Sequence, residues 1–249
     1  MSAIKRYTAL FLILTLVFTL AGCGSSSGNT EKSESSAANV NTENSDGDNS
    51  ASDDMNATSP AQESSEINEL QADTADILVV YFSRTGEQYT VGVIDKGNTA
   101  IVAEMIADKT GADMFEILPQ EDYYPYTYDE LTDVAKKEQN ENARPSYQGD
   151  VPDLSGYSTI FVGAPVWWGD WPMICYTFFE ENADALAGKT LIPFSTHEGS
   201  GLSGFDRKLS NAIPGATVLD GLAIRGNGAQ NKQDKVRESV DDWLSGLGY

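Results

Sequence analysis

The sequence contains few cysteines, histidines and basic residues, and each shortage limits what the chain can do. Among 249 residues there are two cysteines, Cys23 and Cys175, and one histidine, so neither a disulfide framework nor a metal site is predicted. Lys and Arg number 16 against 38 Asp and Glu, which gives a formal net charge of −22. Binding to nucleic acid needs a basic surface, and the acidic balance therefore argues against nucleic acid as a partner.

A long apolar run occurs at the N-terminus. Lys5 and Arg6 precede the apolar residues 9–20, and small residues follow before Cys23. The run is too short to span a bilayer. Basic, apolar and small residues follow one another as in a secretory signal peptide, which we place at residues 1–22. The letters L-A-G-C at 20–23 resemble the bacterial lipobox. This resemblance implies lipidation of Cys23 (diacylglyceryl and palmitate-type chains) and anchoring at the extracytoplasmic face of the cell membrane; an uncleaved anchor and ordinary secretion remain alternatives.

Residues 23–75 are rich in Ser, Asn, Asp, Glu and Ala and have almost no large apolar side chain. Such a segment cannot bury enough surface to offset its ordering entropy, so we expect a disordered acidic tether that spans roughly 40 Å as a coil. Loss of the signal peptide takes the formal charge from −22 to −24. This charge suits a cationic protein partner, or solubility outside the cell. Residues 76–249 have the length of one domain.

The first chemical motif is divided between two places in the chain. S-R-T-G at 83–86 follows an apolar, β-rich run at 77–82, and G-N-T at 97–99 begins an amphipathic stretch that reaches residue 110. A loop between a strand and a helix offers free N–H groups and the positive end of the helix dipole to an anion. The motif predicts a phosphate site, with an ordinary polar turn as the alternative. Its expected residues are Ser83, Arg84, Thr85, Gly97, Asn98 and Thr99.

A tryptophan-rich loop follows a second apolar run at 158–164. In an open parallel sheet ligands bind beyond the carboxyl ends of the strands, where indole rings can stack against a flat ring. The alternative is that the tryptophans fill the core or cap the next helix, and for Trp171 we favour that alternative. The expected ligand contacts are Pro165, Val166, Trp167, Trp168 and Gly169.

A third run, 190–194, leads into small and polar residues that suggest close backbone approach to a ligand. The expected contacts are Thr196, His197, Glu198, Gly199, Ser200 and Gly201. His197 is either a hydrogen-bond donor to the ligand or an ordinary surface residue. Glu198 is more simply a solvated charge or a partner of a helix start. Cys175 is expected to be a small buried hydrophobe.

Together the three segments resemble the flavodoxins, whose FMN phosphate occupies a loop of the pattern S/T-x-T-G-x-T. The chain departs from that pattern because residues 87–96 appear inserted in the loop. The resemblance covers nearly all of 76–248 and implies FMN, bound non-covalently, as the cofactor. Deleting 87–97 would restore an uninterrupted motif, and from the pattern alone FMN binding should then survive within about tenfold.

The resemblance also implies an α/β fold, a doubly wound five-stranded parallel sheet of order 2-1-3-4-5. Hydrophobic periodicity supports this fold. It predicts a shorter strand at 114–118, a helix at 128–138, a last strand at 216–224 and a final helix at 232–247. The tyrosines at 123–128 are expected to pack on the surface, or else to shape a rim near the cofactor.

Three functions are open. The first is a membrane-tethered FMN protein that transfers electrons, with a redox partner protein or a membrane quinone as its partner. The second is an FMN-dependent NAD(P)H or quinone reductase, and the third is a flavodoxin-like binding module without cofactor. No catalytic residue is predicted for any of them.

Overall fold

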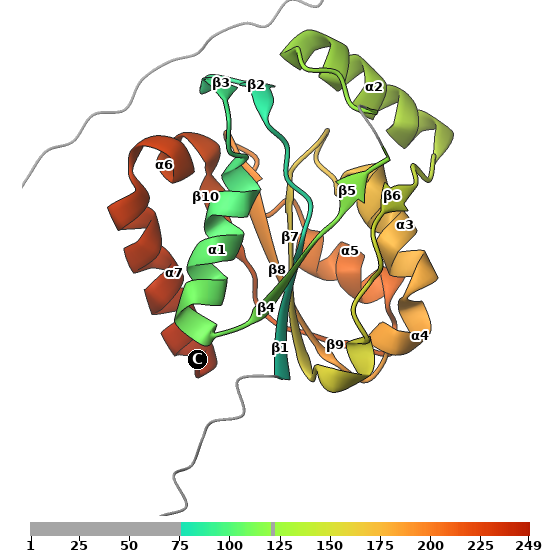
Figure 1. Ribbon diagram of the computed structural model, residues 1–249, viewed down its shortest axis with the longest axis vertical. Coiled ribbons are helices and arrows are strands. Elements are labelled where there is room, and N and C mark those ends of the chain that lie inside the picture. Colours follow the sequence, from blue (N-terminus) through green and yellow to red (C-terminus); the bar gives the residue numbers. More distant parts are fainter. Residues whose placement is uncertain (1–75, 121–122) are drawn as a thin grey trace, which may run out of the picture. The chain divides into compact units, whose positions relative to one another are not determined.

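The structure, a computed structural model, describes residues 76–120 and 123–249. The predicted signal peptide, the lipidation site Cys23 and the tether lie outside the described residues. Figure 1 shows a central sheet covered by helices on both faces. Among the helices described, none combines the length and the apolar character that crossing a membrane requires.

The central sheet is parallel throughout and confirms the predicted strand order. Its strands run in the order β4 (Asp113–Glu116), β1 (Ile77–Tyr81), β7 (Thr159–Pro165), β8 (Thr190–His197) and β10 (Leu222–Arg225), with β9 (Thr217–Val218) also along β8. Since β9 and β10 both pair with β8, they occupy one position, that of the predicted fifth strand. The order reverses between β1 and β7, so the carboxyl ends of these strands form the switch point where ligands bind in such sheets.

The fifth strand is divided because of a proline in its neighbour. β9 pairs with Thr190 and Leu191, and β10 begins its pairing at Phe194. Pro193 lies between these two stretches and has no N–H to donate to a neighbouring strand. Gly221 passes close by, since a Cβ there would lie 2.5 Å from the carbonyl oxygen of Pro193. The predicted strand at 216–224 is therefore interrupted where the ladder loses a donor.

The two faces of β1 alternate, as a strand buried on both sides requires. Val79 packs with α1 (Asn98–Thr110), α6 (Gly226–Asn231) and α7 (Gln233–Leu247) on one face. Leu78 and Val80 pack with α3 (Met173–Glu181), α4 (Ala183–Leu186) and α5 (Phe205–Ala212) on the other. Cys175 of α3 is buried, as predicted, and burial raises the pKa of its thiol.

Four further features lie outside the central sheet and the helices named above. The inserted residues form an antiparallel hairpin, β2 (Gly86–Gln88) with β3 (Gly92–Ile94), and β5 (Leu118–Pro119) pairs with β6 (Tyr147–Gln148). A short 3-10 turn, Leu154–Gly156, precedes β7. Helix α2 (Tyr128–Glu141) lies with the hairpin at the end of the molecule where the sheet strands finish (Figure 1). It extends beyond the predicted range and ends at Glu141, and the next residue, Asn142, caps it with a φ of 49°.

Candidate functional site

The structure brings the two halves of the first motif together. A Cβ on Gly97 would lie 2.1 Å from Oγ of Ser83, so only glycine allows this approach. The hydroxyl oxygen of Ser83 accepts a hydrogen bond from the N–H of Ala100 at 3.0 Å, in the first turn of α1. The hairpin therefore separates the halves in sequence, while their backbones remain in contact.

The start of α1 keeps several donors free. Within the described part of the chain, the N–H groups of Asn98 and Thr99 have no hydrogen-bond partner, as expected for a first helical turn. The Thr99 hydroxyl is buried and shares a 2.8 Å hydrogen bond with the Thr196 hydroxyl. This bond joins the first predicted segment to the third at the base of the site.

Arg84 has a structural role in this arrangement. Its guanidinium donates to the carbonyl oxygens of Glu87 at 2.8 Å and Tyr126 at 2.6 Å, and also to that of Pro125. These contacts hold the segment that precedes α2 against the hairpin. Ser83, Arg84 and Thr85 line a cavity of about 530 Å³ together with Tyr123 and other residues of that segment.

The hairpin also holds the N-terminus of α2. The carboxylate of Glu87 accepts a hydrogen bond from the N–H of Tyr128, the first residue of α2, at 2.9 Å. The N–H of Glu87 donates to the carbonyl of Tyr126 at 3.0 Å. The rings of Tyr89 and Tyr128 stack, with centroids 5.5 Å apart. A carboxylate at a helix N-terminus is a stabilising pair, so the inserted residues fasten α2 to the rest of the domain.

The tryptophan-rich loop contains a tight turn. The N–H and carbonyl of Trp167 bond with those of Asp170 at 2.9 Å in both directions. The two central residues, Trp168 and Gly169, have φ of 50° and 74°, as in type I′ turns. A positive φ is costly for a bulky residue and often marks a functional position. The indole Nε1 of Trp168 donates to the carbonyl of Thr132 in α2 at 3.0 Å, so α2 helps to hold this strained residue.

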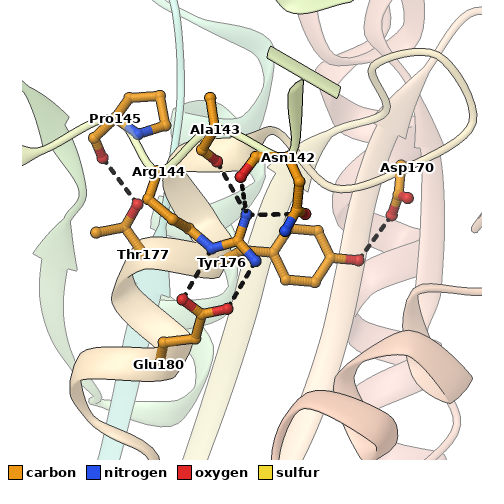
Figure 2. A network of polar contacts seen from close by, with 8 residues as sticks. All are labelled: Asn142, Ala143, Arg144, Pro145, Asp170, Tyr176, Thr177 and Glu180. Atoms are coloured by element: carbon orange, nitrogen blue, oxygen red, sulfur yellow. Dashed lines mark hydrogen bonds and ion pairs between the residues drawn. The ribbon is translucent and has the colours of Figure 1, made fainter. Parts of the chain in front are cut away.

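Figure 2 shows Tyr176 of α3 pointing toward Asp170 of the same turn. The hydroxyl of Tyr176 donates to Asp170 at 2.9 Å, and burial followed by the Asp170 charge raises the pKa of that hydroxyl. Arg144 binds both carboxylate oxygens of Glu180, at 2.8 and 2.6 Å, and its guanidinium lies 5.5 Å from the Tyr176 ring centroid. The turn, the segment after α2 and α3 are therefore linked in one polar network.

The three tryptophans of the loop occupy different environments. Trp171 is buried and stacks on Phe205 at 3.7 Å, so its expected place in the core is confirmed. Trp167 is half-buried, with its ring edge against Phe82 and Tyr124. Trp168 remains 54% exposed.

The third segment ends β8 and turns toward β10. Thr196 and His197 belong to the strand itself, which is longer than predicted. Nδ1 of His197 accepts a hydrogen bond from the N–H of Gly199 at 2.9 Å. The carboxylate of Glu198 accepts from the N–H of Asn227 at 2.7 Å, in the first turn of α6. Glu198 is thus the partner of a helix start, though of a helix distant in sequence.

A cavity of about 540 Å³ opens at the carboxyl ends of β7 and β8, within the range of small-molecule sites. Ten of the predicted ligand contacts line it: Asn98, Pro165, Val166, Trp167, Trp168, Thr196, His197, Glu198, Gly199 and Ser200. Gly97, Thr99, Gly169 and Gly201 are not among its lining residues, and 83–85 line the other cavity. The lining residues that the sequence analysis did not name as ligand contacts are Gln88, Tyr89, Tyr128, Leu131, Thr132 and Ala135.

These six lining residues come from the hairpin and from α2. Leu131 and Ala135 lie one helical turn apart, a spacing that marks a buried helix face but does not say what that face covers. The exposed Tyr89 and the half-buried Tyr128 meet only because the hairpin reaches α2. Tyr128 thus lies at the rim of this cavity, whereas Tyr123, Tyr124 and Tyr126 line the other.

Comparison with known proteins agrees with this architecture. Residues 76–243, more than half of the chain, match the family model described as flavodoxin. No curated protein gives a significant match. Candidate flavoproteins from Bacteroides eggerthii and Bacteroides uniformis are similar in structure, with TM-scores of 0.51 and 0.52 and identities of 28% and 27%.

The B. eggerthii match covers 67% of this chain and 96% of that protein, and the B. uniformis match covers 69% and 98%. A flavoprotein from Lactobacillus acidophilus, whose structure contains FMN, is more distant: 20% identity, a TM-score of 0.49, and coverage of 64% and 99%. The family match, the 2-1-3-4-5 sheet and the cavity at the carboxyl ends of its strands agree, and the chain belongs to the flavodoxin family.

Proposed function

We propose that this protein binds FMN in the cavity of about 540 Å³ and transfers electrons at a membrane surface. The single observation that carries the proposal is this cavity, at the carboxyl ends of β7 and β8, walled by Trp167, Trp168 and the 196–200 segment. When bound, FMN supplies one- and two-electron redox chemistry, while the protein sets its affinity, exposure and potential.

The walls of the cavity fit a flat and mostly uncharged ring system. Indole and phenol rings surround it, and Glu198, the charged residue among those that line it, has its carboxylate occupied by the N–H of Asn227. Within the described residues the N–H groups of Glu198 and Ser200 have no partner. These donors, with apolar walls beside them, match the polar edge and apolar body of an isoalloxazine ring.

The first turn of α1 fits the phosphate of the same ligand. Asn98 lines the cavity of about 540 Å³, and Ala100 binds Ser83, which lines the other cavity, so this turn adjoins both. The hydroxyl of Ser83 accepts from Ala100 and keeps its own proton available. The free N–H groups at the helix start add charge-assisted donors for an anion.

Attachment to the membrane is the further part of the proposal. The L-A-G-C letters at 20–23 and the acidic residues up to 75 support a lipid on Cys23 and a tether that holds the domain outside the cell. A redox partner protein or a membrane quinone would then meet the domain at the membrane. A Cys23→Ser substitution should release the full chain from the membrane fraction, and continued attachment would argue against the anchor.

A second function, the reduction of a small molecule, is favoured by one observation. The hairpin and α2 give the cavity a wall of their own, made from Tyr89, Tyr128, Leu131 and Ala135. Such a wall suits a small planar acceptor, a quinone for example, that enters beside the cofactor.

Preference for FMN over riboflavin tests the proposed function. The purified protein, freed of flavin, should bind FMN at least tenfold more tightly than riboflavin, because one charge-assisted hydrogen bond contributes about 1.5–3 kcal/mol. Quenching of flavin fluorescence measures both affinities. Equal affinities would remove the phosphate site, and absence of binding to either flavin would favour the cofactor-free alternative.

Replacing each cavity tryptophan separates the roles of the two rings. Trp167→Ala should weaken FMN binding by about 1–2 kcal/mol, since the half-buried ring is held in place by Phe82 and Tyr124. Trp168→Ala is the matched variant on the exposed side of the turn and should have the smaller effect. Isothermal titration calorimetry measures both, and two variants with parental affinity would place neither ring against the ligand.

A further inference from the structure

His197 is a polar residue of the cavity, and its contacts constrain which ring nitrogen carries the proton. It is the last residue of β8 and lies beside Arg225 of β10 in the parallel ladder. It lines the cavity and is half-buried. It is also the single histidine of the chain, so any signal from an imidazole belongs to it.

One ring nitrogen is committed to the protein. Nδ1 accepts the hydrogen bond from the N–H of Gly199 at 2.9 Å. An imidazole nitrogen that accepts a hydrogen bond carries no proton, so the proton of the neutral ring is on Nε2. No hydrogen bond joins Nε2 to another of the described residues, and the N–H of Nε2 is left for a ligand.

The surroundings also keep the ring neutral. Burial lowers the pKa of His197, the charge of Arg225 lowers it further, and Glu198 opposes both with a smaller effect. Protonation would place a proton on Nδ1, directly opposite the N–H of Gly199, and that hydrogen bond would be lost. Protonation is therefore less favourable in the folded chain than in the unfolded one, so the free energy of unfolding falls as the pH decreases below about 6.5.

We propose that His197 is a neutral hydrogen-bond donor to the ligand of this cavity, acting through Nε2–H. Since the proposed phosphate site is the first turn of α1, the acceptor that His197 meets is an oxygen or an unprotonated nitrogen of the ring system, such as a carbonyl oxygen. This inference rests on the proposed function, because it concerns the same cavity. FMN carries both ring carbonyls and a phosphate, so the two assignments of His197 can be compared on one ligand. An imidazolium that pairs with the phosphate is the opposite assignment, and the same experiment distinguishes the two.

The state of His197 can be read directly by long-range 1H–15N NMR on the 15N-labelled full chain, without flavin and with FMN. We expect one imidazole at pH 7, with Nε2 protonated and Nδ1 unprotonated in both samples, and a change in the Nε2 proton shift when FMN is added. The signals should vanish in His197→Gln, which confirms their origin. A proton on Nδ1 at pH 7, with or without FMN, would overturn the proposal.

Binding by two variants supplies a second readout. His197→Ala removes the donor and should weaken FMN binding about tenfold, whereas His197→Gln retains an N–H donor and should stay within about threefold of the parent. Circular dichroism and urea unfolding show whether each variant is folded. Parental affinity in His197→Ala would overturn the inference while leaving FMN binding intact. If the parent itself bound no FMN, the proposed function would fail, and the inference of a donor to this ligand would fail with it.

Discussion

Gly163→Ala should reduce the free energy of unfolding by about 3 kcal/mol, the upper range for overpacking a core. Gly163 lies in β7 directly opposite Phe194 of β8. A Cβ added there would lie 2.0–2.5 Å from three atoms of the Phe194 ring. That ring is fully buried, so it cannot move aside without displacing its neighbours. Urea unfolding of the two proteins measures the loss.

A double-mutant cycle identifies the cause of this effect. Phe194→Ala alone should cost about 3–5 kcal/mol, since it removes a large core side chain. In that background Gly163→Ala should cost less than about 1 kcal/mol, because the ring that it strikes has gone. An equal cost in both backgrounds would show that the glycine is needed for the backbone and not for the ring.

Removal of residues 87–97 should weaken FMN binding about hundredfold. The deletion removes Gln88 and Tyr89 from the cavity wall and the carboxylate of Glu87 from the N-terminus of α2. Without that attachment α2 should move away, and the apolar contact that Leu131 and Ala135 offer to the ligand should be lost. One buried side chain of the size of leucine is worth about 1.5–3 kcal/mol, so the loss of this wall accounts for the expected change.

The sequence pattern alone predicts the opposite, that binding survives within about tenfold because the motif is rejoined. Hydrogen exchange of α2, measured beside FMN affinity, decides between the two expectations. Glu87→Gln is an intermediate variant that weakens the α2 attachment and keeps the hairpin. Val93→Ala is the matched control, since Val93 is 61% exposed and does not line the cavity. A folded deletion variant with near-parental affinity would show that the hairpin wall does not contact the ligand.

The main strands and helices α1, α2 and α7 could be predicted because their signals are local, and the strand order followed from the family resemblance. Ile101, Val102, Met105 and Ile106 recur at helical spacing and are all buried in α1. Runs of β-branched and aromatic residues mark β1, β7 and β8, and parallel strands place their carboxyl ends at one edge. For this reason ten of the expected ligand contacts, although widely separated in sequence, line one cavity.

The contacts that the sequence could not predict are those between elements distant in the chain. Nothing local shows that Glu87 reaches the N-terminus of α2, that Leu131 and Ala135 face a cavity, or that Arg84 donates to backbone carbonyls of a distant segment. Helical periodicity identifies a buried face but not its neighbour.

The sequence by itself determined the α/β class and the three segments at the carboxyl ends of strands, because hydrophobic periodicity and turn residues act over a few positions. The strand order followed from the resemblance to the flavodoxins. The tertiary structure decided the second wall of the cavity, the division of the fifth strand beside Pro193 and the surroundings of His197. Each of these depends on contacts between residues distant in the chain or on burial by the whole fold. Burial determines how strongly a charge is desolvated, and hydrogen-bond partners determine which atom carries a proton.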